Sequence, residues 1–174
     1  PPGGGGGPPR PPPARLSKQR PQAHVFSAYM LTSILGQFAV HMGALMYAVR
    51  HALRHAPALT DAELDPEAKF APNLLNTSVF LMSSTMQVAN FAVNYRGHPF
   101  MASLRENTGL LYGLAAVFLV TFACATEISP DLNAMLEVVP LPSLDYRKAL
   151  IGVMLSDIFG CFVVDRVARR ALSS

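Results

Sequence analysis

The sequence predicts an all-α membrane protein with four transmembrane helices. Hydrophobic residues make up 51% of the 174-residue chain, and they are concentrated in four runs separated by charged or proline-bearing links. As helices these runs cover roughly 28 to 37 Å, against a bilayer hydrocarbon core of about 30 Å. The tyrosines lie near the ends of the runs, where their amphipathic rings favour the headgroup layer. A soluble core therefore does not explain the composition.

The four predicted spans set the domain organisation. They cover about residues 25–49, 74–95, 108–126 and 149–167, within a membrane domain of residues 24–172. The first three contain no Asp, Glu, Lys or Arg, and the fourth contains Asp157 and ends with Asp165 and Arg166. Each run is long enough to cross a bilayer once.

The first 23 residues differ in composition from the rest. Most of them form the stretch PPGGGGGPPRPPPAR, which is nearly all proline and glycine and offers no apolar side chains to bury, so a disordered segment is expected at residues 1–23. The segment lacks the apolar stretch of a signal peptide. Because the sequence begins with Pro1 rather than Met, we expect the chain to be a fragment or a processed product.

The distribution of basic residues predicts the orientation. Nine of the fourteen Lys and Arg residues precede the first span, lie between the second and third, or lie at or after the end of the fourth. The other five accompany the acidic residues of the two remaining loops. The positive-inside rule then places both termini and the middle link in the cytosol. The net charge of +3 is no evidence for a nucleic-acid partner.

Polar residues in the first span suggest a helix–helix contact. Gln37 and His41 lie four residues apart, beside Ala39 and Gly43, a small-xxx-small pair that allows a neighbouring helix to approach. Such a seam with interhelical hydrogen bonds is one interpretation. A proton or ion relay through His41 is the other.

The second span carries a longer polar stripe. Ser83, Gln87, Asn90 and Asn94 recur at helical spacing and project from one face. Since amide side chains are costly in hydrocarbon, we expect them to face other helices or a water-filled cavity. They could bond across the bundle or line a substrate path.

The fourth span contains an acidic residue near mid-membrane, Asp157, beside Gly152, Ser156 and Gly160. The small residues repeat every four positions and predict another close-packing face. The carboxylate must be protonated, paired or hydrated, and His41, Gln87 and Asn90 are its expected partners. A role in coupling transport is an alternative to a structural one.

Catalytic, cofactor and metal motifs are not found in the sequence. There is no glycine-rich phosphate loop, no phosphorylation sequence of the DKTGT kind and no nucleophile-and-base set. His51 and His55 could share a metal, but no third ligand is fixed nearby. Cys124 and Cys161 are expected at different depths, so no disulfide is predicted. We therefore predict no catalytic, cofactor-binding or metal residue in this chain.

Several stretches carry a family resemblance. SKQRPQ precedes the first span, LGQFAVH lies within it, and NTSVFLMSSTMQVANFAVNYRGHPFMASLRENTGLLY runs from the second span into the third. With the ending FVVDRVARRAL, these residues resemble the extreme C-terminal part of the type V, subgroup A, P-type ATPases of the endoplasmic reticulum. The resemblance covers about Arg15 to Leu172, and PPGGGGGPPRPPPA departs from it.

The resemblance implies a function for a longer parent protein. The four spans would be the C-terminal support bundle of an ATPase that extracts misinserted transmembrane helices from the endoplasmic reticulum membrane. ATP and Mg²⁺ are the cofactors expected of the parent, and none of the residues for that chemistry lies in this chain. The implied partners are the lipid bilayer, the upstream membrane helices and, through the parent, transmembrane-helix substrates.

Two other functions are left open by the residues themselves. The chain could be an independent four-span transporter with Asp157 and His41 as a proton-coupling pair. Alternatively, it could be a non-enzymatic membrane adaptor whose proline-rich head recruits a polyproline-binding domain.

Overall fold

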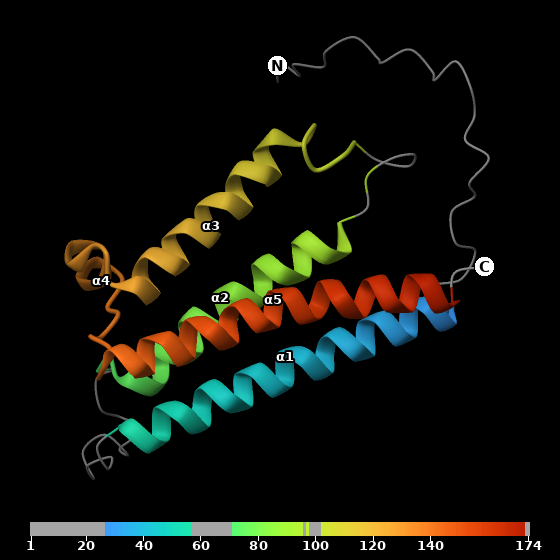
Figure 1. Ribbon diagram of the computed structural model, residues 1–174. Coiled ribbons are helices and arrows are strands. Elements are labelled where there is room, and N and C mark those ends of the chain that lie inside the picture. The colour runs from blue at the N-terminus through green and yellow to red at the C-terminus, as the bar shows by residue number, and fades with distance from the viewer. Residues whose placement is uncertain (1–26, 57–70, 96, 98–101, 173–174) are drawn as a thin grey trace, which may run out of the picture.

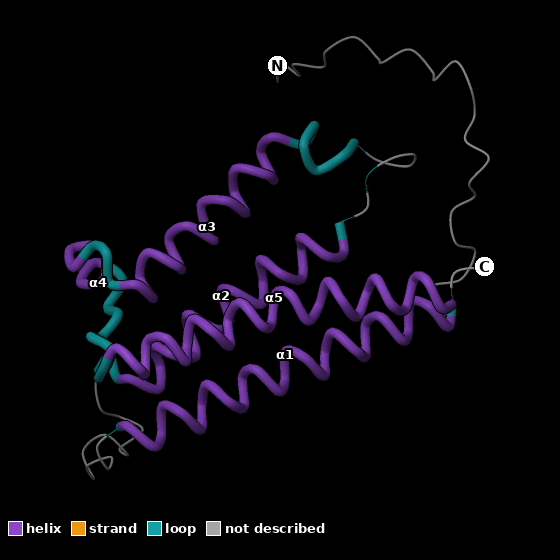
Figure 2. The backbone as a smooth tube through the Cα atoms, in the orientation of Figure 1, coloured by secondary structure: helices purple, strands orange, loops and turns teal. Residues whose placement is uncertain are grey.

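The residues that the structure describes form five helices. The computed structural model describes residues 27–56, 71–95, 97 and 102–172, and these residues contain no strand (Figure 1; Figure 2). The prediction of an all-α fold is confirmed. The predicted disordered segment, residues 1–23, lies outside the described residues. The helices are α1 (Ala28–His55), α2 (Leu74–Asn94), α3 (Thr108–Thr126), α4 (Pro130–Met135) and α5 (Leu144–Leu172).

The long helices α1 and α5 form the centre of the arrangement. They lie antiparallel and in contact over most of their length, and α2 packs against both (Figure 1). The helix α3 diverges from this group. Its buried residues, Thr121, Cys124 and Ala125, all lie near its C-terminal end. The bundle within this chain is therefore three helices with a fourth attached at one end.

Local sequence fixes where the helices begin. Ser27, Asn73, Asn107 and Ser129 each accept a hydrogen bond from the backbone N–H three residues further on. Ser143 Oγ accepts one in the same way from the backbone N–H of Tyr146, at 3.1 Å. Serine and asparagine are preferred caps because their side chains satisfy N–H groups that have no partner within the helix.

The apolar core lies at the end of the bundle where α1 ends and α5 begins. Ala48 and Ala52 of α1 and Leu150 and Met154 of α5 are fully buried there, together with Leu81 of α2. Small side chains on α1 let its backbone approach the larger residues of α2 and α5. The core is thus built of small residues from one helix and large residues from the others.

The link between α3 and α5 fixes that end of the bundle. Glu127 ends α3 in the left-handed region, with φ 53°. Its carboxylate forms an ion pair with Arg147 and accepts a hydrogen bond from the backbone N–H of Leu141, at 2.6 Å. The Thr77 hydroxyl of α2 accepts another from the backbone N–H of Val139, at 3.1 Å. These contacts hold the link against both α2 and α5.

Four helices lie at the predicted spans, and two of them are long and apolar enough to cross a membrane, as judged by length and composition. Among the described residues these are α1 and α3. The helices α2 and α5 occupy the other two predicted ranges but carry more polar residues, including Asp157 and Asp165 in α5. That α2 and α5 also cross a membrane stays a prediction.

The tyrosines near the ends of the predicted spans differ in exposure. Tyr112 is 70% exposed and Tyr47 is 47% exposed. By contrast, Tyr29 and Tyr146 are each 1% exposed because their hydroxyl groups bond to side chains of other helices. Burial against another helix does not fix the depth of a ring in a membrane, so the headgroup position of the tyrosines stays a prediction.

Candidate functional site

The candidate site lies in the half of the bundle opposite the apolar core. It is formed where the N-terminal half of α1 meets the C-terminal halves of α2 and α5. The structure brings most of the polar residues singled out from the sequence to this region, in two clusters and a groove. The first cluster surrounds Asp165, and the second contains His41 and Asp157.

The carboxylate of Asp165 is the centre of the first cluster. Its Oδ1 accepts hydrogen bonds from Tyr29 Oη at 2.6 Å and from Ser33 Oγ at 3.0 Å. Its Oδ2 accepts one from the Arg169 guanidinium at 2.6 Å. Arg169 lies beyond the predicted end of the fourth span, and its hydrogen bond to Asp165 raises the pKa of its guanidinium. Both oxygens of the buried Asp165 carboxylate therefore accept hydrogen bonds.

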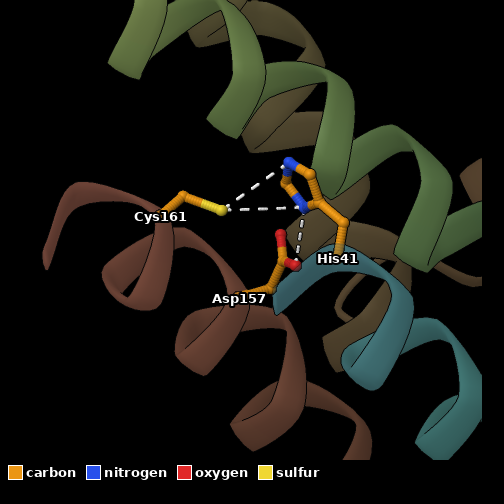
Figure 3. Close-up of side chains that lie close together, drawn as sticks. All are labelled: His41, Asp157 and Cys161. Atoms are coloured by element: carbon orange, nitrogen blue, oxygen red, sulfur yellow. Dashed lines mark hydrogen bonds and ion pairs between the residues drawn. The ribbon is translucent and has the colours of Figure 1, made fainter. Parts of the chain in front are cut away.

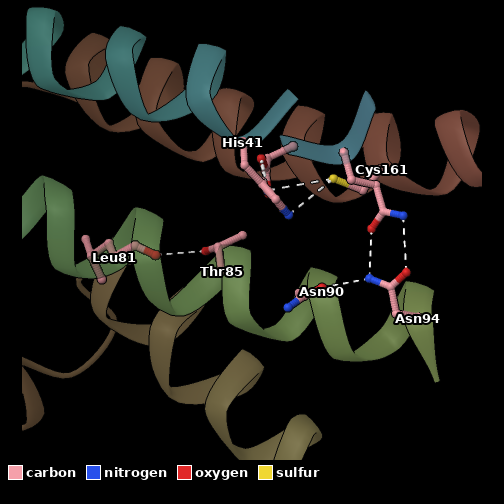
Figure 4. Close-up of polar contacts among 8 residues, drawn as sticks. His41, Leu81, Thr85, Asn90, Asn94 and Cys161 are labelled. Carbon is pink, nitrogen blue, oxygen red and sulfur yellow. Dashed lines mark hydrogen bonds and ion pairs between the residues drawn. The ribbon is translucent and has the colours of Figure 1, made fainter. Parts of the chain in front are cut away.

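A chain of amides extends this cluster to the second helix. Gln37 donates from Nε2 to Ser33 Oγ at 2.9 Å and to Asn94 Oδ1 at 3.2 Å. Asn94 donates from Nδ2 to Gln37 Oε1 at 2.9 Å and to Asn90 Oδ1 at 2.7 Å (Figure 4). Both amides of the Gln37–Asn94 pair are thus donor and acceptor at once. The resulting network, from Asn90 through Gln37 to Asp165, bonds α2, α1 and α5 together.

The second cluster joins α1 and α5 at their midpoints. His41 Nδ1 and Asp157 Oδ1 are 2.7 Å apart, and Cys161 Sγ lies 3.7 Å from His41 Nδ1 and 3.6 Å from Nε2 (Figure 3). Asp157 is 1% exposed and Cys161 is fully buried. Of the three partners expected for Asp157 from the sequence, the structure places His41 against it. The second carboxylate oxygen, Oδ2, is buried and has no hydrogen-bond partner in the part of the chain that the structure describes.

An open groove of about 410 Å³ lies between α1 and α2 beside these clusters. Gln87 and Asn90 are exposed along it, and His41 forms part of its wall. All four residues of the polar stripe of α2, Ser83, Gln87, Asn90 and Asn94, line this groove. Asn94 in addition bonds to Gln37 of α1.

The close contact of α1 with α5 uses one glycine that the sequence indicated, Gly160, and one that it did not, Gly36. A Cβ added to Gly36 would lie 2.5 Å from Val164 Cγ1, and one added to Gly160 would lie 3.0 Å from Val40 Cγ1. Nothing lies within 4 Å of a Cβ added to Gly43 or Gly152. Gly43 and Gly152 therefore make no close contact with another described helix, and their close packing against upstream helices stays a prediction.

The remaining small residues of these two predicted faces are also exposed. Ala39 is exposed on α1 and Ser156 is exposed on α5. The Ser156 hydroxyl instead bonds to the backbone carbonyl of Gly152, at 2.7 Å. Only Gly160, of the three small residues predicted on the fourth span, lies in a close contact with another described helix.

The histidines past the first predicted span stack on a tyrosine. The rings of His51 and Tyr146 lie 4.4 Å apart and nearly parallel, and the ring of His55 meets Tyr146 edge-on at 5.1 Å. His55 Nδ1 is bonded to the backbone carbonyl of His51, at 2.9 Å. Burial lowers the pKa of His51, and the nearby His55 and Arg54 lower it further. The pair thus packs against the start of α5.

Five residues of the site were not singled out from the sequence as site residues: Tyr29, Ser33, Cys161, Asp165 and Arg169. A signal for them was present. Tyr29, Ser33, Gln37 and His41 recur every four residues on α1, and Asp157, Cys161, Asp165 and Arg169 do so on α5. Two helices with complementary polar stripes of equal period are able to pair along them. Both cysteines are free, as expected.

The arrangement offers two kinds of chemistry. The Asp165 network holds three helices in one register through hydrogen bonds. The His41–Asp157 pair can share a proton within the bundle, and with Cys161 it brings nitrogen, oxygen and sulfur ligand atoms within 4.8 Å of one another.

Comparison with known proteins gives consistent matches along the chain. The family described as Cation transporting ATPase, C-terminus, matches residues 10–169. The chain is 38% identical over 158 residues to the endoplasmic reticulum transmembrane helix translocase spfA of Aspergillus fumigatus. It is 42% identical over 151 residues to the endoplasmic reticulum transmembrane helix translocase of Saccharomyces cerevisiae. It is 43% identical over 156 residues to the probable manganese-transporting ATPase PDR2 of Arabidopsis thaliana.

These matches cover nearly all of this chain and a small part of each relative. They include 91%, 87% and 90% of the chain, respectively, but only 12%, 12% and 13% of the relatives. The chain therefore spans about an eighth of the length of the curated relatives that it matches.

Proposed function

Because the chain belongs to the family of cation-transporting ATPase C-termini, we propose that it is the membrane-support module of a longer P-type ATPase. In this proposal the parent protein uses ATP to extract misinserted transmembrane helices from the endoplasmic reticulum membrane. The module itself is not catalytic. It binds and positions the upstream membrane helices through its exposed faces.

One observation carries the structural role: the polar side chains of three helices bond to one another. Gln37, Asn94 and Asp165 lie on different helices and belong to one hydrogen-bonded network. Interhelical hydrogen bonds of this kind hold transmembrane bundles together, at about 0.6 kcal/mol each on average. A network of this size stabilises a fixed bundle rather than a mobile gate.

The proposed topology has four spans and two cytosolic ends. The helices α2 and α5 have 21 and 29 residues, and at 1.5 Å per residue both are long enough for a hydrocarbon core of about 30 Å. The many exposed apolar side chains, such as Leu35, Leu119 and Phe159, suit a lipid or helix-facing surface. The basic residues counted above support cytosolic termini.

The chemistry of the parent would reside outside this chain. ATP and Mg²⁺ would be bound by the upstream part of the protein, and transmembrane-helix substrates would reach it through upstream membrane helices. The bilayer and those helices are then the direct partners of the module. The exposed small residues Ala39, Gly43, Gly152 and Ser156 are available for close contact with them.

The first test is the size of the natural protein. We expect an antibody raised against residues 56–73 to detect, in native membranes, a band many times heavier than the 18.7 kDa of this chain. A sole band near 18.7 kDa would contradict the proposal. An antibody against the link 127–143 serves as an independent control, since it must detect the same band.

A second candidate function rests on the His41–Asp157 contact. A histidine and a carboxylate 2.7 Å apart inside the bundle are suited to carry a coupled proton in an independent transporter. The Asp157→Asn variant separates the two functions. Proton coupling predicts that the folded variant loses transport, whereas a support role predicts reduced stability or assembly with the specific activity of the folded protein retained.

A further inference from the structure

We infer that His41, Asp157 and Cys161 form a binding site for one Zn²⁺ ion between α1 and α5. The three residues come from two helices and converge at the midpoints of both (Figure 3). Each offers one ligand atom, and these atoms all lie within 4.8 Å of one another. The inference rests on this chain's own side chains and goes beyond the proposed support role.

The ligand types select the metal. Imidazole nitrogen, thiolate sulfur and carboxylate oxygen are the three protein ligands of Zn²⁺, and sites with three protein ligands keep a fourth position open for water. Harder cations such as Mg²⁺ and Ca²⁺ prefer oxygen ligands alone. The cluster therefore favours a borderline-soft ion over the magnesium that accompanies nucleotides.

The distances are close to those of a zinc site. Two ligands of a tetrahedral Zn²⁺ ion lie about 3.4 to 3.6 Å apart, given bond lengths of about 2.0 to 2.3 Å. Cys161 Sγ is already 3.7 Å from His41 Nδ1. The 2.7 Å contact between Nδ1 and Asp157 Oδ1 would have to open by about 0.7 Å. The ion would then replace the proton of that hydrogen bond.

A buried oxygen atom of Asp157 lacks a partner, which indicates that a ligand binds here. Asp157 is 1% exposed, yet its Oδ2 has no hydrogen-bond partner among the described residues. A buried carboxylate oxygen without a partner is costly, and more so inside a membrane. A cation that the Asp157 carboxylate binds through both of its oxygens would give Oδ2 a partner as well.

Charge balance also favours a divalent ion. Without metal, His41 and Asp157 share one proton and Cys161 holds another, so the cluster is neutral overall. Binding of Zn²⁺ releases both protons to solvent, and the ion then balances one carboxylate and one thiolate. The cluster is neutral in both states, and no net charge is added within the bundle. An entry path exists because His41 borders the open groove between α1 and α2.

The test compares zinc binding by the intact protein and by cysteine variants. The protein that carries this chain is purified in mild detergent, freed of metal and titrated with Zn²⁺ against a chromophoric chelator, with metal content counted by mass spectrometry. We expect Cys161→Ala to bind one Zn²⁺ fewer per chain than the wild type. The matched control is Cys124→Ala, which removes the other buried cysteine and should bind as the wild type does.

Two further measurements keep the inference testable if Cys161→Ala folds poorly. Co²⁺ bound to the wild-type protein should give a thiolate-to-cobalt charge-transfer band that persists in Cys124→Ala. Zinc affinity of the wild type should fall by up to about 100-fold per pH unit on acidification, because two protons compete with each ion. Wild-type protein without the thiolate band, or Cys161→Ala with unchanged stoichiometry and affinity, would overturn the inference.

Discussion

The two halves of the α1–α5 contact are built from different chemistry on the same helical period. In one half, Tyr29, Ser33 and Gln37 of α1 face the end of α5 that carries Asp165. In the other half, the α1 residues at equivalent spacing are Ala44, Ala48 and Ala52, and the buried α5 residues include Leu150 and Met154.

The difference shows how two requirements are divided along one pair of helices. In lipid, apolar side chains gain little from meeting one another, so association depends on close packing and on interhelical hydrogen bonds. The half that contains Ala44, Ala48 and Ala52, here called the alanine half, packs closely, and any helix of suitable shape could pack against it in the same way. The half that contains Tyr29, Ser33 and Gln37, here called the polar half, forms hydrogen bonds that are possible in one register of the two helices only. The following predictions test this division, from the largest expected effect to the smallest.

Replacing Asp165 by alanine should have the largest effect. It removes the acceptor of Tyr29, Ser33 and Arg169 at once, and we expect a loss of about 2 to 4 kcal/mol in the local stability of the α1–α5 contact. Hydrogen exchange of the α5 backbone amides measures this loss. The control is Asp145→Ala, which removes an exposed carboxylate from the first turn of α5 and should change exchange little. Equal exchange in both variants would contradict the assigned role of Asp165.

Enlarging Ala48 should have the next largest effect, in the other half. Ala48 is fully buried against the core, so Ala48→Leu forces added methylene groups into a packed contact at a cost of about 1 to 3 kcal/mol. Thermal unfolding in detergent measures the cost. The matched control is Ala28→Leu at the exposed first residue of α1. A destabilisation no larger than that of the control would show that this half does not depend on close packing.

Two glycine substitutions on α1 should have effects of opposite sign. Gly36→Ala brings a Cβ to 2.5 Å from Val164 Cγ1, and we expect a net loss of about 1 kcal/mol. Gly43→Ala meets nothing within 4 Å, and alanine's higher helix propensity should stabilise the helix by up to about 1 kcal/mol. Melting temperatures of the two variants, measured side by side, check the signs. Destabilisation by Gly43→Ala in the intact protein would instead indicate an upstream helix on that face.

Acidification should have the smallest effect of these changes, a small loss of stability in the alanine half. The pKa of His51 is lowered by burial and by His55 and Arg54, so the unfolded state binds a proton more readily than the folded state. Stability is then fully present above the ordinary histidine pKa of about 6.5 and falls as the pH drops below it. Melting temperatures of the wild type and His51→Phe between pH 7.5 and 5.5 test this. An equal decline in both would exclude His51 as the cause.

The sequence predicted much of the architecture because its signals are local. The four apolar runs located the four long helices, although α1 ends six residues after its run and α5 extends five residues beyond each end of its run. Ser27, Asn73 and Asn107 immediately precede three of these helices. The resemblance to the P-type ATPases is confirmed by the family match over residues 10–169 and by relatives 38 to 43% identical. These features depend on composition, spacing and residue order within short segments.

The candidate site was predicted less completely. Gln37, His41, Asn94 and Asp157 were singled out because polar residues in apolar runs are costly. Asp165 was read only as the polar end of a span, and Cys161 was considered only for a disulfide. The roles of both depend on which α1 residues lie opposite them, and contacts such as Tyr29–Asp165 join residues 136 positions apart.

The sequence by itself determined that this chain is helical, where its long helices lie and which family it belongs to. Those properties follow from hydrophobic runs, capping residues and motifs that are read along the chain. Only the tertiary structure decided that Gly36 rather than Gly43 lies in the close contact, and that Asp157 meets His41 and Cys161. The physical reason is that a helix presents several faces of similar composition. Which face is buried depends on the rotation and register of its neighbours.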